Sequence, residues 1–221
     1  MATSPNTASF ETALNITHIA ADIEVSDVSN AVWKNGESIF VDRYWSGAEA
    51  PAGRCFSAIL LWSDTSLYIL FTANQEVPLI ASDRPDLTKK SIGLWDRDVC
   101  EIFVAPNAME PRKYFEFEVA PTGEWLDVAL DATSGTRIPD WDYRSEFKSF
   151  ASVEPGKVIS AMKIPWTAFG RMPKVGDVWL GNLFRCVGQD PGRGYLAWRP
   201  TFTNEPNFHV PERFGEFRFV A

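Results

Sequence analysis

The chain has 221 residues, of which 45% are hydrophobic and 23% are charged, and its formal net charge is −8 at pH 7. This length and balance fit a folded protein with a sizeable core and argue against disorder. The acidic charge argues against a nucleic acid or an anionic membrane as partner, and no apolar stretch is long enough to span a membrane.

Strand signals follow one another along the chain after a polar, flexible lead-in, which we predict over residues 1–15. Apolar, β-branched and aromatic runs separated by turn signals predict strands over 38–44, 54–62, 67–71, 99–104, 114–119, 125–130, 157–164, 178–187, 194–198 and 214–220. The best helix candidate is 165–169, which starts with a proline and precedes a glycine. We predict long loops, the usual place for binding sites, over 76–94 and 131–143.

These signals predict an all-β fold, an antiparallel β-sandwich of about eleven strands with one short helix, as a single domain over 16–221. Cys55, Cys100 and Cys186 lie far apart in apolar segments without CxxC spacing, so we expect three buried free thiols. The N-terminus has no basic and apolar segments typical of a signal peptide. We therefore expect a cytoplasmic protein, or an extracellular or periplasmic one if a leader has been removed.

The predicted strand over 99–104 and the residues just before it combine a tryptophan and acids with an apolar core pattern. Trp95 precedes the strand, and alternation along it places Val99, Glu101 and Phe103 on one face. Glu101 therefore projects from an apolar strand, and a buried carboxylate needs a partner or a ligand. The alternative is a structural salt bridge to an arginine.

The next strand carries two more acids. Glu116 and Glu118 share one face of the strand over 114–119. Either they face solvent, as in a half-exposed strand, or they join Glu101 in a polar floor suited to hydroxyl groups or a cation.

A sugar ring has apolar C–H faces and a rim of hydroxyls. Its site needs flat aromatic platforms together with carboxylate, amide or guanidinium groups. The chain offers such groups in three separate segments, at Trp95, Glu101, Asn182, Arg185 and Phe208. Phe208 lies in a proline-bounded loop, where it covers either the sandwich edge or a ligand.

Three blocks of the sequence, in order, resemble family 9 carbohydrate-binding modules. The stretch 59–69 resembles that family's L-W-D hairpin, 95–103 resembles its W-x-x-D-x-V-E-I-F block, and 208–215 resembles its closing W-x-x-P-x-x-F-G segment. The resemblance implies a DOMON-like β-sandwich, of the kind found in stand-alone bacterial proteins. It also implies that the chain binds sugars without cleaving them, in the catabolism of plant-type glycans.

The resemblance also implies roles for single residues. Trp95 is the first stacking platform, Phe208 stands where the family has a second tryptophan, and Glu101 accepts a hydrogen bond from a sugar hydroxyl. Glu118 stands in place of a family arginine, and Arg185 and His209 are replacement donors. The expected carbohydrate-binding residues are Trp95, Asp98, Glu101, Glu118, Asn182, Arg185, Phe208 and His209.

The expected partner is a mono- or oligosaccharide, with no nucleic acid, no membrane and a monomeric state. We expect no cofactor; calcium occurs in some relatives, but no calcium-loop motif is present. Three other functions remain open. They are a glycoside-acting enzyme that uses paired glutamates, a haem-binding DOMON-like domain with Met or His ligands, and a structural interaction domain whose site has decayed.

Overall fold

The computed structural model describes residues 12–221, in which thirteen strands form one curled sheet. Its strands are β1 (Ala13–His18), β2 (Ser38–Val41), β3 (Phe56–Trp62), β4 (Ser66–Asn74), β5 (Val99–Ala105), β6 (Lys113–Val119), β7 (Trp125–Asp131), β8 (Ile138–Asp140), β9 (Lys148–Glu154), β10 (Lys157–Pro165), β11 (Val178–Val187), β12 (Gly194–Ala197) and β13 (Gly215–Val220). Short 3₁₀ helices lie between them: η1 (Ala31–Asn35), η2 (Ala52–Arg54), η3 (Leu94–Asp96), η4 (Trp166–Phe169) and η5 (Pro211–Arg213). None of these helices is long and apolar enough to cross a membrane.

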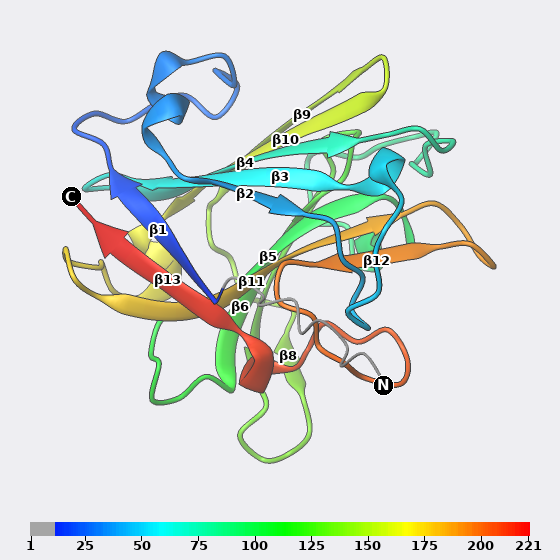
Figure 1. Cartoon of the computed structure of the whole chain (residues 1–221). Coiled ribbons are helices and arrows are strands. Elements are labelled where there is room, and N and C mark those ends of the chain that lie inside the picture. The colour runs from blue at the N-terminus through cyan, green and yellow to red at the C-terminus, as the bar shows by residue number, and fades with distance from the viewer. Residues whose placement is uncertain (1–11) are drawn as a thin grey trace, which may run out of the picture.

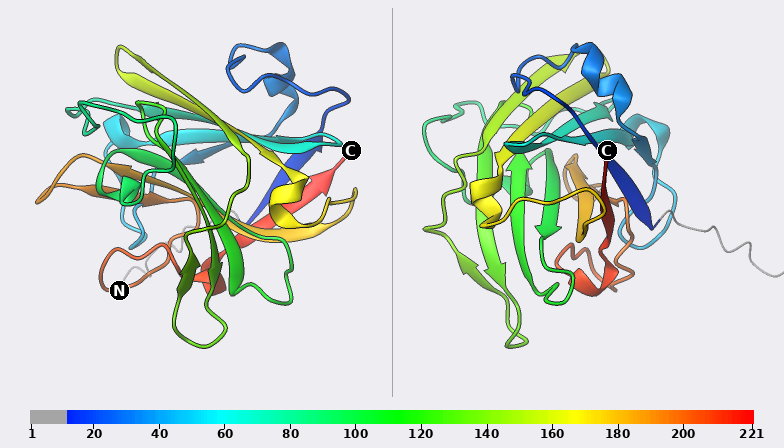
Figure 2. Two further views of the ribbon diagram at one scale, coloured as in Figure 1. Left: turned by 180° about the vertical axis from the view of Figure 1, so that it is seen from behind. Right: turned by 90° about the vertical axis from the view of Figure 1, so that its left-hand side faces the viewer.

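The strand order is β8-β7-β6-β5-β11-β13-β1-β3-β4-β10-β9, with β12 paired to β11 and β2 paired to β3. The sheet curls into two layers: β2, β3, β4, β10 and β9 lie above β5, β6 and β11, and β13 and β1 lie along one side (Figure 1). Figure 2 shows the same arrangement from behind and from the side.

The main hydrophobic core lies between the two layers. It includes Leu60 and Phe71 from the upper layer and Ile102, Phe117 and Leu183 from the lower one, all fully buried. Each such side chain stabilises the fold by about 1.5–3 kcal/mol through its removal from water. This shared core fixes which face of the lower strands points inward and which is left for a site.

The all-β class is confirmed, but the sheet is not purely antiparallel, and the described residues form more strands and more short helices than the sequence predicted. β1 runs parallel to both of its neighbours, β13 and β3. β1 begins at Ala13, within the predicted lead-in, whose residues 1–11 lie outside the described residues. β8 and β9 were also missed, because their side chains are mostly partly or fully exposed and lack the apolar alternation of a strand.

Several local predictions are confirmed. The helix candidate forms η4, which follows Pro165 and ends at Gly170 in a left-handed conformation, with φ of 66°, that favours glycine. Cys55, Cys100 and Cys186 are buried free thiols. The long loop before β5 contains no regular element until η3 begins.

The outer face of the lower layer carries a second hydrophobic cluster. It includes Phe103 from β5, Tyr114 from β6 and Phe184 from β11, with Phe208 and Phe214 from the C-terminal segment packed on them. These side chains point away from the main core, because they alternate along their strands with residues of that core. The candidate site lies on this face.

Candidate functional site

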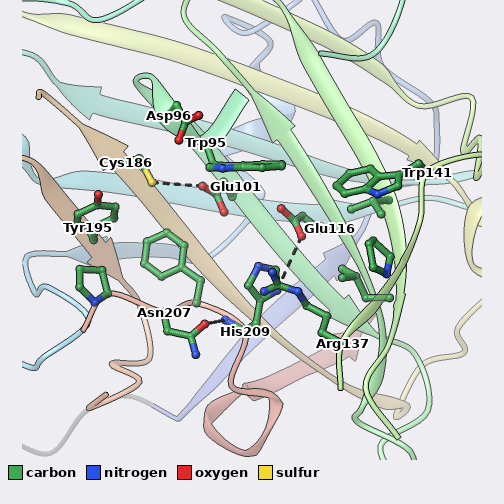
Figure 3. Close-up of a pocket in the computed structure, with 15 residues that line it drawn as sticks. Trp95, Asp96, Glu101, Glu116, Arg137, Trp141, Cys186, Tyr195, Asn207 and His209 are labelled. Atoms are coloured by element: carbon green, nitrogen blue, oxygen red, sulfur yellow. Dashed lines mark hydrogen bonds and ion pairs between the residues drawn. The ribbon is translucent and has the colours of Figure 1, made fainter. Parts of the chain in front are cut away.

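A cavity of about 410 Å³ opens on this outer face, within the usual size range of ligand pockets. Figure 3 shows Trp95 and Trp141 along one side, Tyr195, Asn207 and His209 along the other, and acidic side chains between them. The remaining lining residues are Asp96, Glu101, Glu116, Val128, Leu130, Arg137, Pro139, Cys186, Pro206 and Phe208. The cavity therefore combines aromatic walls with a carboxylate floor.

Trp95 and Trp141 form one aromatic wall. Their ring centroids are 6.2 Å apart and their planes differ by 30°, so the rings stack with an offset. The two residues retain 38% and 37% of their surface exposed, and both line the cavity. The wall therefore offers flat apolar area to a ligand.

The position of Trp95 is fixed through the backbone of η3. The Arg193 guanidinium donates hydrogen bonds to the carbonyl oxygens of Trp95 at 2.6 Å, Asp96 at 2.9 Å and Arg97 at 2.7 Å. Gly93 precedes η3 with φ of 85°, a left-handed conformation that glycine adopts without strain. Arg193 thus holds the turn that presents the ring.

A buried ion pair ties the two tryptophan-bearing loops to β7. Lys90 Nζ lies 2.6 Å from Asp127 Oδ1, and it donates to the carbonyl oxygens of Asp127 and Tyr143, also at 2.6 Å. Asp127 Oδ2 accepts hydrogen bonds from the Ser145 amide and hydroxyl, both at 2.7 Å. Lys90 belongs to the loop that leads to Trp95, and Tyr143 follows Trp141, so this cluster positions both sides of the wall.

The opposite wall is built around Phe208. Its ring stacks on Phe184 with centroids 4.1 Å apart and planes within 13°, and Tyr195 meets it edge-on at 6.2 Å. Phe208 is 8% exposed, so most of its surface is already used in packing. It lines the cavity as a side wall, while Tyr195 and Asn207 bring polar atoms beside it.

The floor consists of Glu101 and Glu116, and Glu118 lies directly beneath them; the three residues are 2%, 4% and 0% exposed, respectively. One carboxylate oxygen from each lies within 4.8 Å of the others. Glu101 Oε1 accepts a hydrogen bond from the Cys186 thiol at 3.5 Å, and Glu116 Oε2 lies 4.0 Å from His209 Nδ1. The predicted convergence of the three carboxyls is confirmed, but only Glu101 and Glu116 line the cavity, and Glu118 is buried behind them. The salt-bridge alternative for Glu101 and the solvent-facing alternative for Glu116 and Glu118 are wrong.

Burial raises the pKa of all three carboxyls, Glu101, Glu116 and Glu118. Desolvation is the main cause, and the charge of neighbouring carboxylates adds to it at Glu101 and Glu118, whose pKa values rise well above the usual range. The floor therefore retains protons that exposed carboxyls lose.

His209 is a neutral imidazole beside this floor. Its Nδ1 is hydrogen-bonded to the Tyr114 hydroxyl at 2.9 Å, and burial, followed by the charge of Arg137, lowers the pKa of His209 to about 3. Arg137 itself is exposed at the edge of the cavity. The site thus has one cation at its rim and a neutral histidine below it.

Comparison with known proteins identifies the family. Residues 25–221 match the family described as carbohydrate family 9 binding domain-like. The chain belongs to this family. The predicted membership is confirmed, and with it carbohydrate binding as the function of the domain. No curated protein sequence matches the chain.

Solved structures show the same fold as this family 9 domain. A candidate carbohydrate-binding protein from Bacteroides uniformis is 18% identical with a TM-score of 0.73, covering 94% of this chain and 99% of that chain. A family 9 carbohydrate-binding module from Caldicellulosiruptor kristjanssonii, in complex with cellotriose, is 15% identical with a TM-score of 0.69. The match covers 95% of this chain and 94% of that chain. The glucose complex of a family 9 module from that organism is 16% identical, with a TM-score of 0.67. The match covers 95% of this chain and 96% of that chain.

Four of the eight expected binding residues of the family 9 domain line the cavity: Trp95, Glu101, Phe208 and His209. Glu118 lies beneath the floor and is fully buried. The other three, described next, lie outside the cavity and make structural contacts.

Arg185 points into the core between the layers. Its guanidinium donates to the carbonyl oxygens of Arg54 at 2.7 Å and Asn74 at 2.6 Å, and to the side chain of Gln75. Arg185 alternates with Phe184 along β11, so one of the two must face the core, and it is Arg185. Its hydrogen bonds join the two layers, and it is not a donor in the cavity.

Asn182 and Asp98 brace loops next to the site. The Asn182 amide donates to the Arg199 carbonyl at 2.8 Å and accepts from the Arg199 amide at 2.9 Å. Asp98 accepts from the Gly188 amide at 2.6 Å and from the Gln75 side chain at 2.9 Å. Both side chains therefore use their polar atoms within the protein.

The sequence interpretation missed Trp141, Arg137, Tyr195 and Asn207 as lining residues. The available signal for Trp141 was its place in the predicted long loop 131–143 of a tryptophan-rich chain. That loop pairs partly as β8 with β7, and this pairing brings Trp141 beside Trp95.

Proposed function

We propose that the cavity binds one sugar unit of a mono- or oligosaccharide without cleaving it. The observation that carries this proposal is the exposed pair of Trp95 and Trp141 beside a floor of carboxyl groups in one cavity. The apolar C–H face of a pyranose packs on the aromatic wall. Its hydroxyls meet Glu101 and Glu116 in the floor.

The floor suits neutral hydroxyl groups because burial raises the pKa of its carboxyls, which favours their protonated form when no cation is bound. A protonated carboxyl donates one hydrogen bond and accepts others, so it complements a hydroxyl, which does the same. Asn207 and Arg137 add an amide and a guanidinium at the edge of the cavity. The relatives in complex with glucose and cellotriose support a glucose-type ligand for this chain as well.

The geometry favours binding over glycoside hydrolysis. Hydrolases hold two carboxyl groups about 5–5.5 Å or about 6.5–9.5 Å apart across the scissile bond. Here three carboxylate oxygens lie within 4.8 Å of one another, and Glu118 is fully buried below the cavity. Glu101 and Glu116 therefore form one compact group on one side of a bound sugar, and Asp96, next to Trp95, is the remaining carboxyl of the lining.

Calorimetric titration with glucose, xylose and their short β-linked oligosaccharides tests the proposal. We expect saturable binding with a dissociation constant in the range of about 1 μM to 1 mM, because a single stacked ring removes little area from water. Trp95→Ala weakens it, whereas Phe40→Ala, at an exposed aromatic on β2 outside the cavity, leaves it unchanged. Folded protein that binds no saccharide of this panel, or a Trp95→Ala variant with full affinity, contradicts the proposal.

A further inference from the structure

Among the three acidic side chains at the base of the cavity, Glu118 is the one that contact with a sugar does not explain. Glu118 is fully buried and does not line the cavity. Among residues 12–221, no N–H or hydroxyl group donates a hydrogen bond to either of its carboxylate oxygens. The side chains that converge with it are those of Glu101 and Glu116, which are also acids. A sugar in the cavity touches Glu101 and Glu116 but leaves Glu118 without a partner of its own.

The strand register forces this convergence. Glu101 on β5 lies directly opposite Glu118 on β6, and Glu116 lies two residues away on the same face. Like charges that face each other across two strands destabilise a sheet. On the other side of β6, Leu126 and Val128 of β7 lie opposite Glu118 and Glu116, so this strand supplies no compensating cation. The fold concentrates acidic groups where an apolar cluster would otherwise continue.

We propose that Glu101, Glu116 and Glu118 bind one divalent cation of the calcium type at the floor of the cavity. The ligand atoms are all carboxylate oxygens, which hard cations prefer. Calcium binds oxygens at about 2.3–2.6 Å, so two of its ligands lie no more than about 5 Å apart. The three oxygens here lie within 4.8 Å of one another, which fits that span.

The composition of the group favours calcium over zinc. Cys186 lies beside Glu101 and His209 lies beside Glu116, yet neither belongs to the converging set of ligand atoms. The Cys186 thiol donates to Glu101, and Nδ1 of His209 is hydrogen-bonded to the Tyr114 hydroxyl. The sulfur and nitrogen ligands that zinc prefers are thus close by, but they are already in hydrogen bonds and do not join the three carboxylates.

The three carboxylates leave some coordination positions of the proposed ion unfilled. Three carboxylates supply only part of the six to eight oxygens that calcium takes. Glu101 and Glu116 line the cavity, so the remaining positions face it and are filled by water or by the hydroxyls of the bound sugar. This last step rests on the proposed sugar binding, whereas the cation site itself does not.

Terbium luminescence tests the cation site directly. Tb³⁺ replaces calcium at oxygen sites, and Trp95 and Trp141 lie at the same cavity to transfer excitation energy to it. After treatment of the full chain with EDTA, we expect saturable tryptophan-sensitised emission that Ca²⁺ reverses. Glu118→Gln, which keeps the shape and removes the charge, weakens Tb³⁺ and Ca²⁺ binding at least tenfold. The matched control is Glu110→Gln at an exposed glutamate just before β6, and it has no effect.

Calcium calorimetry and a thermal melt of each variant complete the test. One equivalent of Ca²⁺ bound by the wild type, together with a folded Glu118→Gln variant that does not bind it, supports the proposal. No heat and no change in melting temperature at millimolar Ca²⁺, or equal affinity in Glu118→Gln, overturns it. Glu101→Gln provides the same comparison if Glu118→Gln does not fold.

Titration with a sugar, in the presence and absence of Ca²⁺, distinguishes a failure of this proposal from a failure of the proposed function. Glucose binding by EDTA-treated protein that takes up no Ca²⁺ overturns the cation site and leaves sugar binding standing. Ca²⁺ uptake without glucose binding supports the cation site and contradicts the proposed sugar binding. Binding of glucosamine that depends on Glu118 in a protein that ignores Ca²⁺ overturns the metal site in favour of an organic ammonium group.

Discussion

Replacement of Trp141 by alanine is the most specific prediction, because only the structure reveals this residue as part of the site. A tryptophan buries up to about 250 Å², so the 37% that is exposed at Trp141 amounts to roughly 90 Å². A sugar ring that covers half to all of this area gains about 1–2 kcal/mol at about 25 cal/mol per Å². Trp141→Ala therefore weakens sugar binding about 5- to 30-fold.

Titration calorimetry with glucose or cellotriose measures this loss. Trp95→Ala gives a similar decrease, since its exposed fraction of 38% is nearly the same. Phe208→Ala acts differently: at 8% exposure it offers little area to a ligand, but it leaves a hole beside Phe184, so it lowers stability. If Trp141→Ala binds within twofold of wild type while Trp95→Ala is impaired, the reasoning about a shared wall is refuted.

Three further predictions concern the scaffold. Lys90→Met leaves the buried Asp127 without its ion pair and lowers the free energy of unfolding by about 3–5 kcal/mol in urea denaturation, whereas Lys89→Met, at an exposed side chain, changes it little. In EDTA, the free energy of unfolding falls as the pH rises above the ordinary pKa of a glutamate, because the raised pKa of Glu118 lets the folded state keep a proton that the unfolded state has lost. Glu118→Gln flattens this slope in thermal melts at a series of pH values, and an unchanged slope contradicts the assignment. Arg185→Lys lowers the melting temperature by removing bonds between the layers but leaves the sugar affinity of the folded protein unchanged, and a selective loss of affinity counts against its structural role.

The parts of the fold that the sequence predicted are those where burial imposes a clear pattern. β3, β5, β6 and β11 are apolar or alternate strictly, and each lies close to its predicted range. β1 has two buried apolar residues within a polar segment, and β9 is an exposed edge. Their pairing depends on distant strands that no local pattern reveals.

The site was predictable where one residue both breaks an apolar pattern and lies on a strand. Glu101 is such a residue, and its convergence with Glu116 and Glu118 followed from alternation once the two strands were taken as neighbours. Arg185 was misplaced because β11 is buried on both faces, so alternation alone does not say which face holds the ligand. Trp141 was missed because its position depends on β8 and on the Lys90 ion pair.

The central claim is that a sugar stacks on the wall formed by Trp95 and Trp141. The nine tryptophans give indole N–H signals that a two-dimensional nitrogen–proton NMR spectrum of labelled protein resolves, and single variants assign them. Titration with glucose is predicted to shift the Trp95 and Trp141 signals, while those of Trp33, Trp62 and Trp166, whose indoles donate to backbone carbonyls elsewhere, stay in place. Saturation with glucose that moves other indole signals, or none, contradicts the account.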